Sequence, residues 1–119
     1  MVEQRYIDYW RSQRHDHEAQ VQRWQQEAWA VVQQVKTVLV SQFGATKIIV
    51  FGSLVRGRFN ADSDIDMAVA GIPKADFFTA LATVNQISQR WIDLKPLESL
   101  EPHFRARVLA TGQVLDAEC

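Results

Sequence analysis

Three aspartates lie within short apolar segments of this sequence, and their spacing suits the binding of a divalent cation. Asp64 and Asp66 are two residues apart, and Asp93 lies in the run 91–94. Residues two apart in a strand point to the same side and lie about 6–7 Å apart along it. Carboxylates held this close repel each other and resist burial unless a cation neutralises them. Mg²⁺ prefers such hard oxygen ligands, with water and substrate phosphates completing its shell.

Each acid also has an ordinary structural interpretation. Asp64 and Asp66 could form a solvated strand face or a helix cap, and Asp93 could face water on an edge strand. For Asp64 and Asp66, the neighbouring apolar residues argue against the ordinary structural interpretation. They supply the buried side of the segment and leave both acids at its start; they are Ile65, Met67 and Val69.

A Gly-Ser pair directly follows an apolar run upstream of these acids. Gly52 and Ser53 come after residues 46–51, which read as a buried strand. Glycine lets the backbone approach a phosphate closely, the following N–H groups can point at it, and the serine hydroxyl can donate. Taken alone, the pair is equally a simple turn. Beside three acids, it would complete a two-metal phosphoryl-transfer site.

The elements that must position these residues follow from periodicity. A long helix is expected from about residue 7 to residue 43, since no Gly or Pro interrupts the chain before Gly44. Strands are expected at 46–51, 64–69, 91–94 and 113–116, and further helices at 75–90 and 102–110. The expected fold class is α/β (α+β), a small mixed sheet flanked by helices.

The long helix permits two interpretations. Its second half carries one apolar face, which predicts ordinary packing on the sheet; the face comprises Val21, Trp24, Ala28, Val31, Val35 and Val38. Its first half, with Tyr6, Trp10 and Trp24, could instead project to meet a partner or a second copy of the chain, because Trp and Tyr are favoured at interfaces.

Composition narrows the class of protein. The chain has 119 residues and a net charge of −1, which does not support binding to a nucleic-acid backbone. No long apolar run and no apolar secretion signal are present, so we expect a soluble, cytoplasmic protein without membrane contact. The single cysteine, Cys119, excludes an intramolecular disulfide and a cysteine-based zinc site.

The run from Gly52 to Gly57, continuing to Ser63-Asp64-Ile65-Asp66, resembles the signature of minimal nucleotidyltransferase (MNT) domains of the DNA polymerase β superfamily. The resemblance covers about residues 31–116, because 92–94 matches the strand of the third carboxylate. It implies a polymerase β-like nucleotidyltransferase fold. We therefore expect an N-terminal helical extension at 1–28 and a nucleotidyltransferase domain at 29–119.

The resemblance also implies residue roles. Gly52 and Ser53 would bind the triphosphate, Asp64 and Asp66 would ligate both of two Mg²⁺ ions, and Asp93 would ligate the catalytic ion and help to activate the acceptor hydroxyl.

Further residues of the motif have supporting roles. Arg56 and Ser63 are counted with the nucleotide-binding residues. Arg56 would either touch phosphate or brace the turn by pairing with an acid, Ser63 would order the loop, and Gly57 would permit the chain to reverse. Lys47 and Arg58 are expected to be surface charges. The histidines show no metal-ligand spacing; they are His15, His17 and His103.

The implied activity is transfer of a nucleoside monophosphate, AMP from ATP, to a hydroxyl. Small MNT domains resemble the antitoxin halves of prokaryotic toxin–antitoxin pairs, whose partner is a HEPN-domain ribonuclease modified on a tyrosine. The alternative is a non-catalytic binding module that neutralises a toxin by stoichiometric contact, with the long N-terminal helix as its motivating feature. A homo-oligomer formed through that helix remains open.

Overall fold

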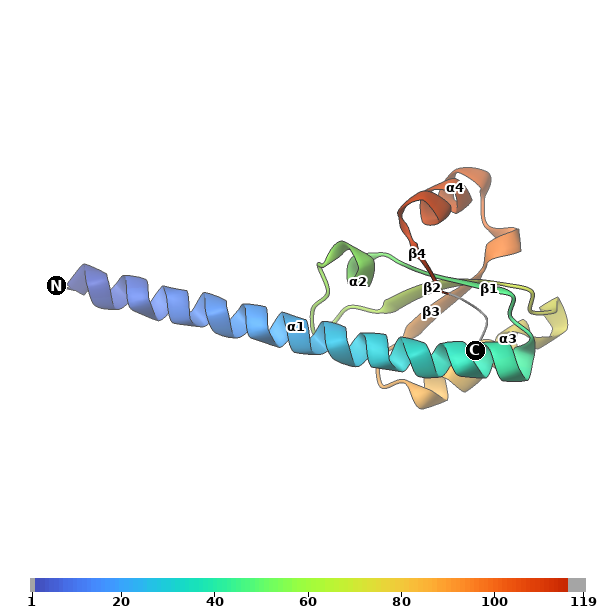
Figure 1. Cartoon of the computed structure of the whole chain (residues 1–119), viewed down its shortest axis with the longest axis horizontal. Helices are drawn as coiled ribbons and strands as arrows, with labels where there is room; N and C mark the ends of the chain where they lie inside the picture. The colour runs from blue at the N-terminus through green and yellow to red at the C-terminus, as the bar shows by residue number, and fades with distance from the viewer. Residues whose placement is uncertain (1, 116–119) are drawn as a thin grey trace.

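The protein is a four-stranded mixed sheet with α1 and α3 on one face and α4 on the other (Figure 1). This computed structural model describes the backbone of residues 2–115 and the side chains of residues 4, 5 and 7–115. Three sequence-based statements fall outside that range. They concern the side chain of Tyr6, the strand end at residue 116 and the cysteine at residue 119.

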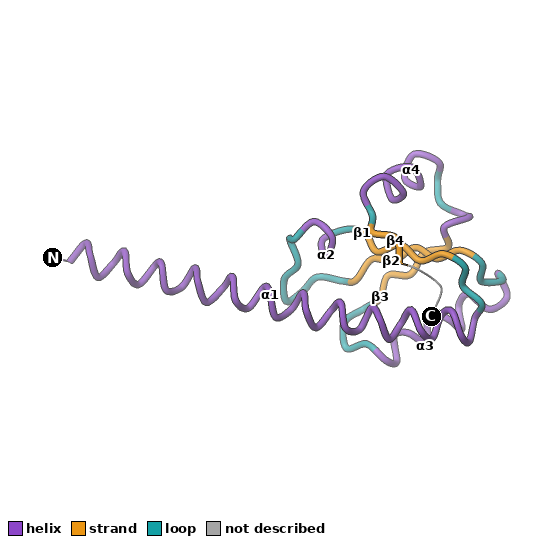
Figure 2. The backbone as a smooth tube through the Cα atoms, in the orientation of Figure 1, coloured by secondary structure: helices purple, strands orange, loops and turns teal. Residues whose placement is uncertain are grey.

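The strands adopt the order β3-β2-β1-β4, which confirms the expected mixed sheet. β1 (Lys47–Phe51) is antiparallel to β2 (Ile65–Ala70) and to β4 (Gln113–Leu115), whereas β3 (Ile92–Pro96) runs parallel to β2. The parallel pair is joined by α3, as a parallel connection requires (Figure 2).

The helices agree with the sequence prediction apart from their ends. α1 spans Val2–Phe43 and α4 spans Pro102–Thr111, while α2 (Ser53–Arg56) and the 3₁₀ helix η1 (Leu97–Ser99) are short. α3 covers Lys74–Ile87 and so stops three residues before the predicted end at 90. Its extension to 90 was wrong because Ser88 takes an extended conformation and its hydroxyl forms a turn with the backbone of Arg90.

Each sheet face has its own core. Odd-numbered β2 residues and even-numbered β1 and β3 residues pack against α1 and α3, together with buried side chains of α1; the α1 members are Ala28, Val32, Val35 and Leu39. The opposite face packs against η1 and α4 through Ile49, Phe51, Ala68, Leu97 and Val108. Alternating side-chain direction in a strand produces this division, which leaves even-numbered β2 residues on the α4 face.

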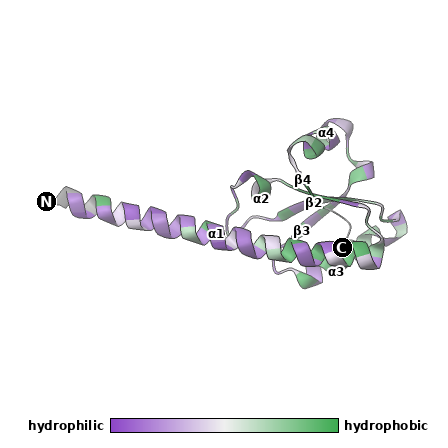
Figure 3. Ribbon diagram, viewed as in Figure 1, coloured by the Kyte–Doolittle hydropathy of each residue, from purple (hydrophilic) through white to green (hydrophobic). Residues whose placement is uncertain are grey.

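The N-terminal half of α1 projects away from the domain (Figure 1). The molecule is 66 Å long but only 30 × 23 Å across. Every described side chain before residue 19 is exposed, whereas Ala28 is fully buried. The projecting half is mostly hydrophilic in Figure 3, yet Ile7, Tyr9 and Trp10 are 43%, 58% and 54% exposed. The second half of α1, in contrast, packs on the sheet as expected.

Among the described residues, no helix is apolar enough over sufficient length to span a membrane.

Candidate active site

Sheet register brings two of the predicted site aspartates together. Asp66 in β2 pairs directly with Asp93 in the parallel strand β3, and Phe51 at the end of β1 pairs with Asp66 on its other side. The neighbours of Asp66 in β2, Ile65 and Met67, are buried in the α1-side core. Both acids therefore lie on the α4 face, next to the turn that begins at Gly52.

Gly52 is needed at this turn for both its conformation and its lack of a side chain. Its φ angle is +79°, in the region that favours glycine. A Cβ atom at this position would lie 2.3 Å from Oδ2 of Asp66. The glycine therefore makes room for the carboxylate and lets the backbone approach any ligand of that carboxylate.

Asp64 does not lie within the strand that was predicted to hold it. β2 begins at Ile65, whose N–H donates to the carbonyl of Trp91 at 3.0 Å, and Asp64 is exposed on the preceding loop. The register that starts the ladder at Ile65 leaves Asp64 outside it. Asp64 is still close enough for its charge to raise the pKa of Asp66, so the acids share one electrostatic site.

Asp66 is the electrostatically strained member of the group. Its pKa is raised from 3.8 to about 6, first by burial and then by the negative charges of Asp93 and Asp64, while Lys95 partly offsets the increase. A half-buried carboxylate beside two others prefers to share a proton or a cation. This is the electrostatic environment expected of a divalent-cation ligand before the cation binds.

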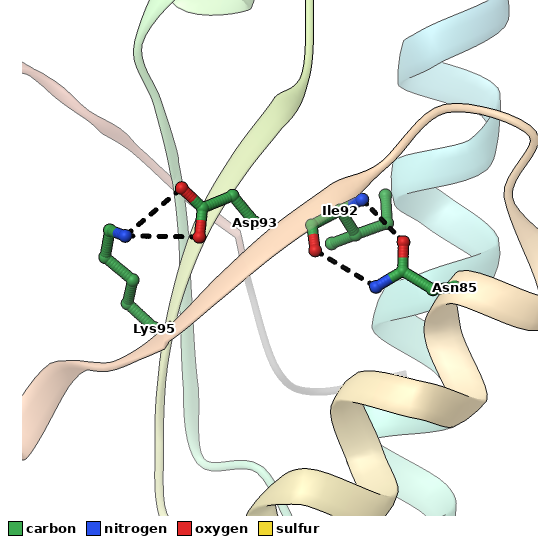
Figure 4. Close-up of polar contacts among 4 residues, drawn as sticks. All are labelled: Asn85, Ile92, Asp93 and Lys95. Atoms are coloured by element: carbon green, nitrogen blue, oxygen red, sulfur yellow. Dashed lines mark hydrogen bonds and ion pairs between the residues drawn. The ribbon is translucent and has the colours of Figure 1, made fainter.

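Asp93 already has a cationic partner. The Nζ atom of Lys95 lies 3.1 Å from both carboxylate oxygens of Asp93 (Figure 4). The two residues are two apart in β3 and so project from the same side of the strand. Lys95 was not predicted from the sequence as a site residue, although its spacing of two residues from Asp93 places it on the same side of the strand. A metal that uses Asp93 must share it with, or take it from, this ammonium group.

The strand that carries Asp93 is held in place by an asparagine of α3. Asn85 accepts from the N–H of Ile92 at 2.7 Å and donates to the carbonyl of Ile92 at 3.1 Å (Figure 4). β3 is an edge strand, and these bonds occupy backbone groups on the side that no strand covers. Asn85 was not predicted from the sequence, because nothing in the pattern of the helix indicates this contact.

The short helix α2 begins directly at the Gly-Ser pair. Ser53 is its first residue, and Gly57 ends it with a φ of +75°, the left-handed conformation that glycine favours at a helix end. Arg56 is exposed and forms no ion pair with an acid among the described residues, so the bracing alternative is not observed. Ser63 orders its loop as predicted, because its Oγ accepts from the N–H of Asn60 at 2.9 Å.

The remaining charged residues named from the sequence lie on the surface. Lys47, Arg58 and the three histidines are exposed. The exposed positions of Lys47 and Arg58 agree with their expected role as surface charges.

The carboxylates of the site fit magnesium when water and substrate phosphates complete the coordination shell. Within the described residues, no group of three His, Cys, Asp or Glu side chains could by itself hold a metal ion. Mg²⁺ commonly takes only one or two carboxylates and completes its shell with water and substrate phosphates. Asp66 with Asp93 or Asp64 would supply that number of protein ligands, and the glycine turn leaves space beside Asp66.

The fold is that of a polymerase β-like nucleotidyltransferase. The family described as "Polymerase beta, Nucleotidyltransferase" matches residues 33–117, and the chain belongs to this family. Comparison with curated proteins gives no significant match.

Two solved structures are similar to this chain. One, provisionally described as a minimal nucleotidyltransferase, has a TM-score of 0.63 and 27% identity, covering 75% of this chain and 94% of its own. The other is the crystal structure of a toxin–antitoxin with AMP-PNP; it has a TM-score of 0.58 and 19% identity, covering 71% of this chain and 69% of its own. These likenesses agree with the expected polymerase β-like fold.

Proposed function

We propose that this protein is a metal-dependent adenylyltransferase that transfers AMP from ATP to a hydroxyl on a partner protein. The observation that carries the proposal is the register pairing of Asp66 with Asp93 beside the Gly52 turn. Acids that destabilise one another in the free protein are suited to a ligand that brings positive charge.

In the proposed reaction, the acceptor oxygen forms a bond to the α-phosphorus of ATP. The bond from that phosphorus to the bridging oxygen of the β-phosphate breaks, and pyrophosphate leaves. Two Mg²⁺ ions would supply charge stabilisation for the attacking and leaving oxygens. Asp64 and Asp66 would hold the ions, and Asp93 would ligate the catalytic ion and help to activate the acceptor hydroxyl, whose proton would pass to the Asp93 carboxylate.

The Gly52-Ser53 turn would hold the triphosphate. Gly52 admits close approach of the backbone, and the hydroxyl of Ser53, the first residue of α2, would donate to a phosphate oxygen. Exposed Arg56, one turn further on, would contact phosphate. Ser63 would act indirectly, by holding the loop before Asp64.

A protein acceptor is favoured by the shape of the chain. The compact domain leaves little surface for a large acceptor, whereas α1 extends an exposed aromatic segment beyond it. The similar toxin–antitoxin structure supports an antitoxin role, and we propose a HEPN-domain toxin as the partner. Use of ATP as the donor is consistent with a cytoplasmic location.

The test is transfer of radiolabel from α-labelled ATP to a candidate partner protein, beginning with whatever protein is encoded next to this chain, in the presence of Mg²⁺. Label should appear on the partner with the wild-type protein and be lost with the Asp64→Asn, Asp66→Asn double variant. Label from γ-labelled ATP should not appear, because pyrophosphate leaves.

A second candidate function rests on the projecting segment of α1. The protein could neutralise its partner by binding alone, through the exposed residues Ile7, Tyr9 and Trp10. Full neutralisation of the toxin by the double aspartate variant would favour this binding module over the enzyme, since that variant retains the helix but not the acids.

A further inference from the structure

Arg90 gathers the loop that leads into the acidic site. Its Nη1 atom donates to three backbone carbonyls: those of Asn60 at 2.9 Å, Ala61 at 3.1 Å and Ser63 at 2.9 Å. The last of these belongs to the peptide bond that joins Ser63 to Asp64. The guanidinium group therefore holds the backbone immediately before the first aspartate of the motif.

The same guanidinium group is fixed from its other side. Its Cζ atom lies 4.4 Å from the ring centroid of Phe59, a side chain that is only 1% exposed. The backbone of Arg90 is held by the hydroxyl of Ser88, which accepts from the N–H of Arg90 at 3.1 Å. Arg90 is thus a fixed point between the α3–β3 connection and the loop before β2.

The loop at 60–63 depends on the Arg90 hydrogen bonds because its own hydrogen bonds are few and local. Asn60 and Ser63 exchange bonds across a tight turn, and Asn60 Oδ1 accepts from the N–H of Asp62. These contacts set the shape of the loop but not its place against the sheet. The first ladder bond, from Ile65 to the carbonyl of Trp91, begins only after Asp64.

We propose that Arg90 is a positioning residue that holds the 60–63 loop against the domain and so places Asp64 beside Asp66 for metal and triphosphate binding. This inference rests on the proposed function for the role of Asp64. Arginine suits the task because its planar group can stack on Phe59 while donating to several carbonyls. Lysine could reach a carbonyl but would stack less well.

The experiment compares Arg90→Ala and Arg90→Lys with the wild-type protein and with the control Arg105→Ala, which removes an exposed arginine from α4. Hydrogen–deuterium exchange of residues 60–65 reports on the loop without any ligand. Isothermal titration with ATP and Mn²⁺ reports on the site. Circular dichroism melting identifies any variant that fails to fold.

We expect faster exchange at 60–65 in Arg90→Ala and about 10- to 100-fold weaker binding of Mn²⁺ and ATP, the range typical of residues that orient metal ligands. Arg90→Lys should retain part of the slow exchange at 60–65 and part of the affinity for Mn²⁺ and ATP. Arg105→Ala should match the wild-type protein in both measurements. If Arg90→Ala does not fold, the proposal is tested with Arg90→Lys alone, which should show faster exchange at 60–65 and weaker binding of Mn²⁺ and ATP than the wild-type protein.

Unchanged exchange at 60–65 in the folded variants would overturn the proposal. Faster exchange with unchanged binding would overturn the positioning role, since the loop would then be held without consequence for the site. If the wild-type protein binds no Mn²⁺ and ATP, the proposed function fails and the positioning role fails with it, while the exchange still shows whether Arg90 holds the loop.

Discussion

At the scale of single residues, the site is arranged at the expense of stability. Asp66 is half-buried beside two other acids, and Gly52 takes a positive φ so that the Asp66 carboxylate has room. Residues that lower the stability of the folded state without an evident structural benefit are typical of functional sites. This strain can be measured by substitution.

Replacing Asp66 with Asn should stabilise the metal-free protein at neutral pH. The raised pKa means that the folded state favours protonated Asp66; this contribution to stability is complete below about pH 4 and is lost as the pH rises through about 6. Discounted for partial exposure, the gain should be about 2–4 °C in Tm at about pH 8. Thermal melts at about pH 4 should show no gain. A gain of equal size at both pH values would contradict the electrostatic explanation.

Gly52→Ala should destabilise the protein more than Gly57→Ala. Both glycines have positive φ angles, but only a Cβ at Gly52 meets another atom, Oδ2 of Asp66. Backbone strain costs about 1–3 kcal/mol at either position, and the clash adds to it at Gly52. Urea denaturation of the two variants isolates that difference. Equal losses would mean that the space beside Asp66 is not needed.

Lys95→Met should tighten the binding of Mn²⁺ without nucleotide. Lys95 occupies both oxygens of Asp93, so its removal frees that carboxylate and increases the negative charge of the site. The pair is partly exposed, with side chains 36% and 38% accessible. A discounted interaction of ~1 kcal/mol corresponds to at most about a fivefold change in affinity. Lys74→Met, at the start of α3, is the matched control. Weaker binding would show instead that Lys95 helps to build the site.

At the scale of elements, the position of β3 determines where Asp93 lies. β3 is an edge strand whose outer side is bonded by Asn85 of α3. The helix thereby replaces part of a missing neighbouring strand, and it supports the register in which Asp93 faces Asp66.

Asn85→Ala should destabilise the domain by about 1–3 kcal/mol, because it leaves backbone groups of the buried residue Ile92 without partners. It should also weaken nucleotide binding indirectly, through movement of Asp93. Urea denaturation measures the first effect, and Gln86→Ala at the exposed next position is the control. Equal stability of the two variants would show that Asn85 does not hold β3 in place.

At the scale of the whole molecule, α1 serves two purposes along its length. From Ala28 onward it covers one face of the sheet, and Trp24 also packs against that core. Before residue 19 its described side chains are exposed (Figures 1 and 3). Most helical stability in proteins comes from packing of an apolar face, and the exposed side chains before residue 19 have no such packing on this domain, which favours contact of the projecting segment with a partner or a second copy.

Removal of residues 1–18 should leave the stability of the domain nearly unchanged, whereas removal of 1–28 should lower it by about 2–5 kcal/mol through loss of Trp24 and Ala28 from the core. Denaturant unfolding distinguishes the two. The comparison also tests the predicted domain boundary after residue 28. Sedimentation before and after the shorter truncation would reveal whether a homo-oligomer depends on the projecting segment.

The sequence by itself determined the order of the elements and the identity of the central motif. Periodicity in α1, β1 and β2 depends on residues near in the chain, and Gly52, Ser53 and the aspartates form a compound pattern readable along it. Helix and strand ends were less well predicted, as at Ser88 and Asp64, because they depend on turn bonds and strand register.

Only the tertiary structure decided which side chains meet. The pairing of Asp66 with Asp93 depends on the register of two strands separated by a helix, and the contacts of Arg90 join positions 27–30 residues apart. Such contacts depend on how whole elements pack, and residue type and local spacing do not specify that packing. The raised pKa of Asp66 has the same origin, since burial and neighbouring charge exist only once the sheet has formed.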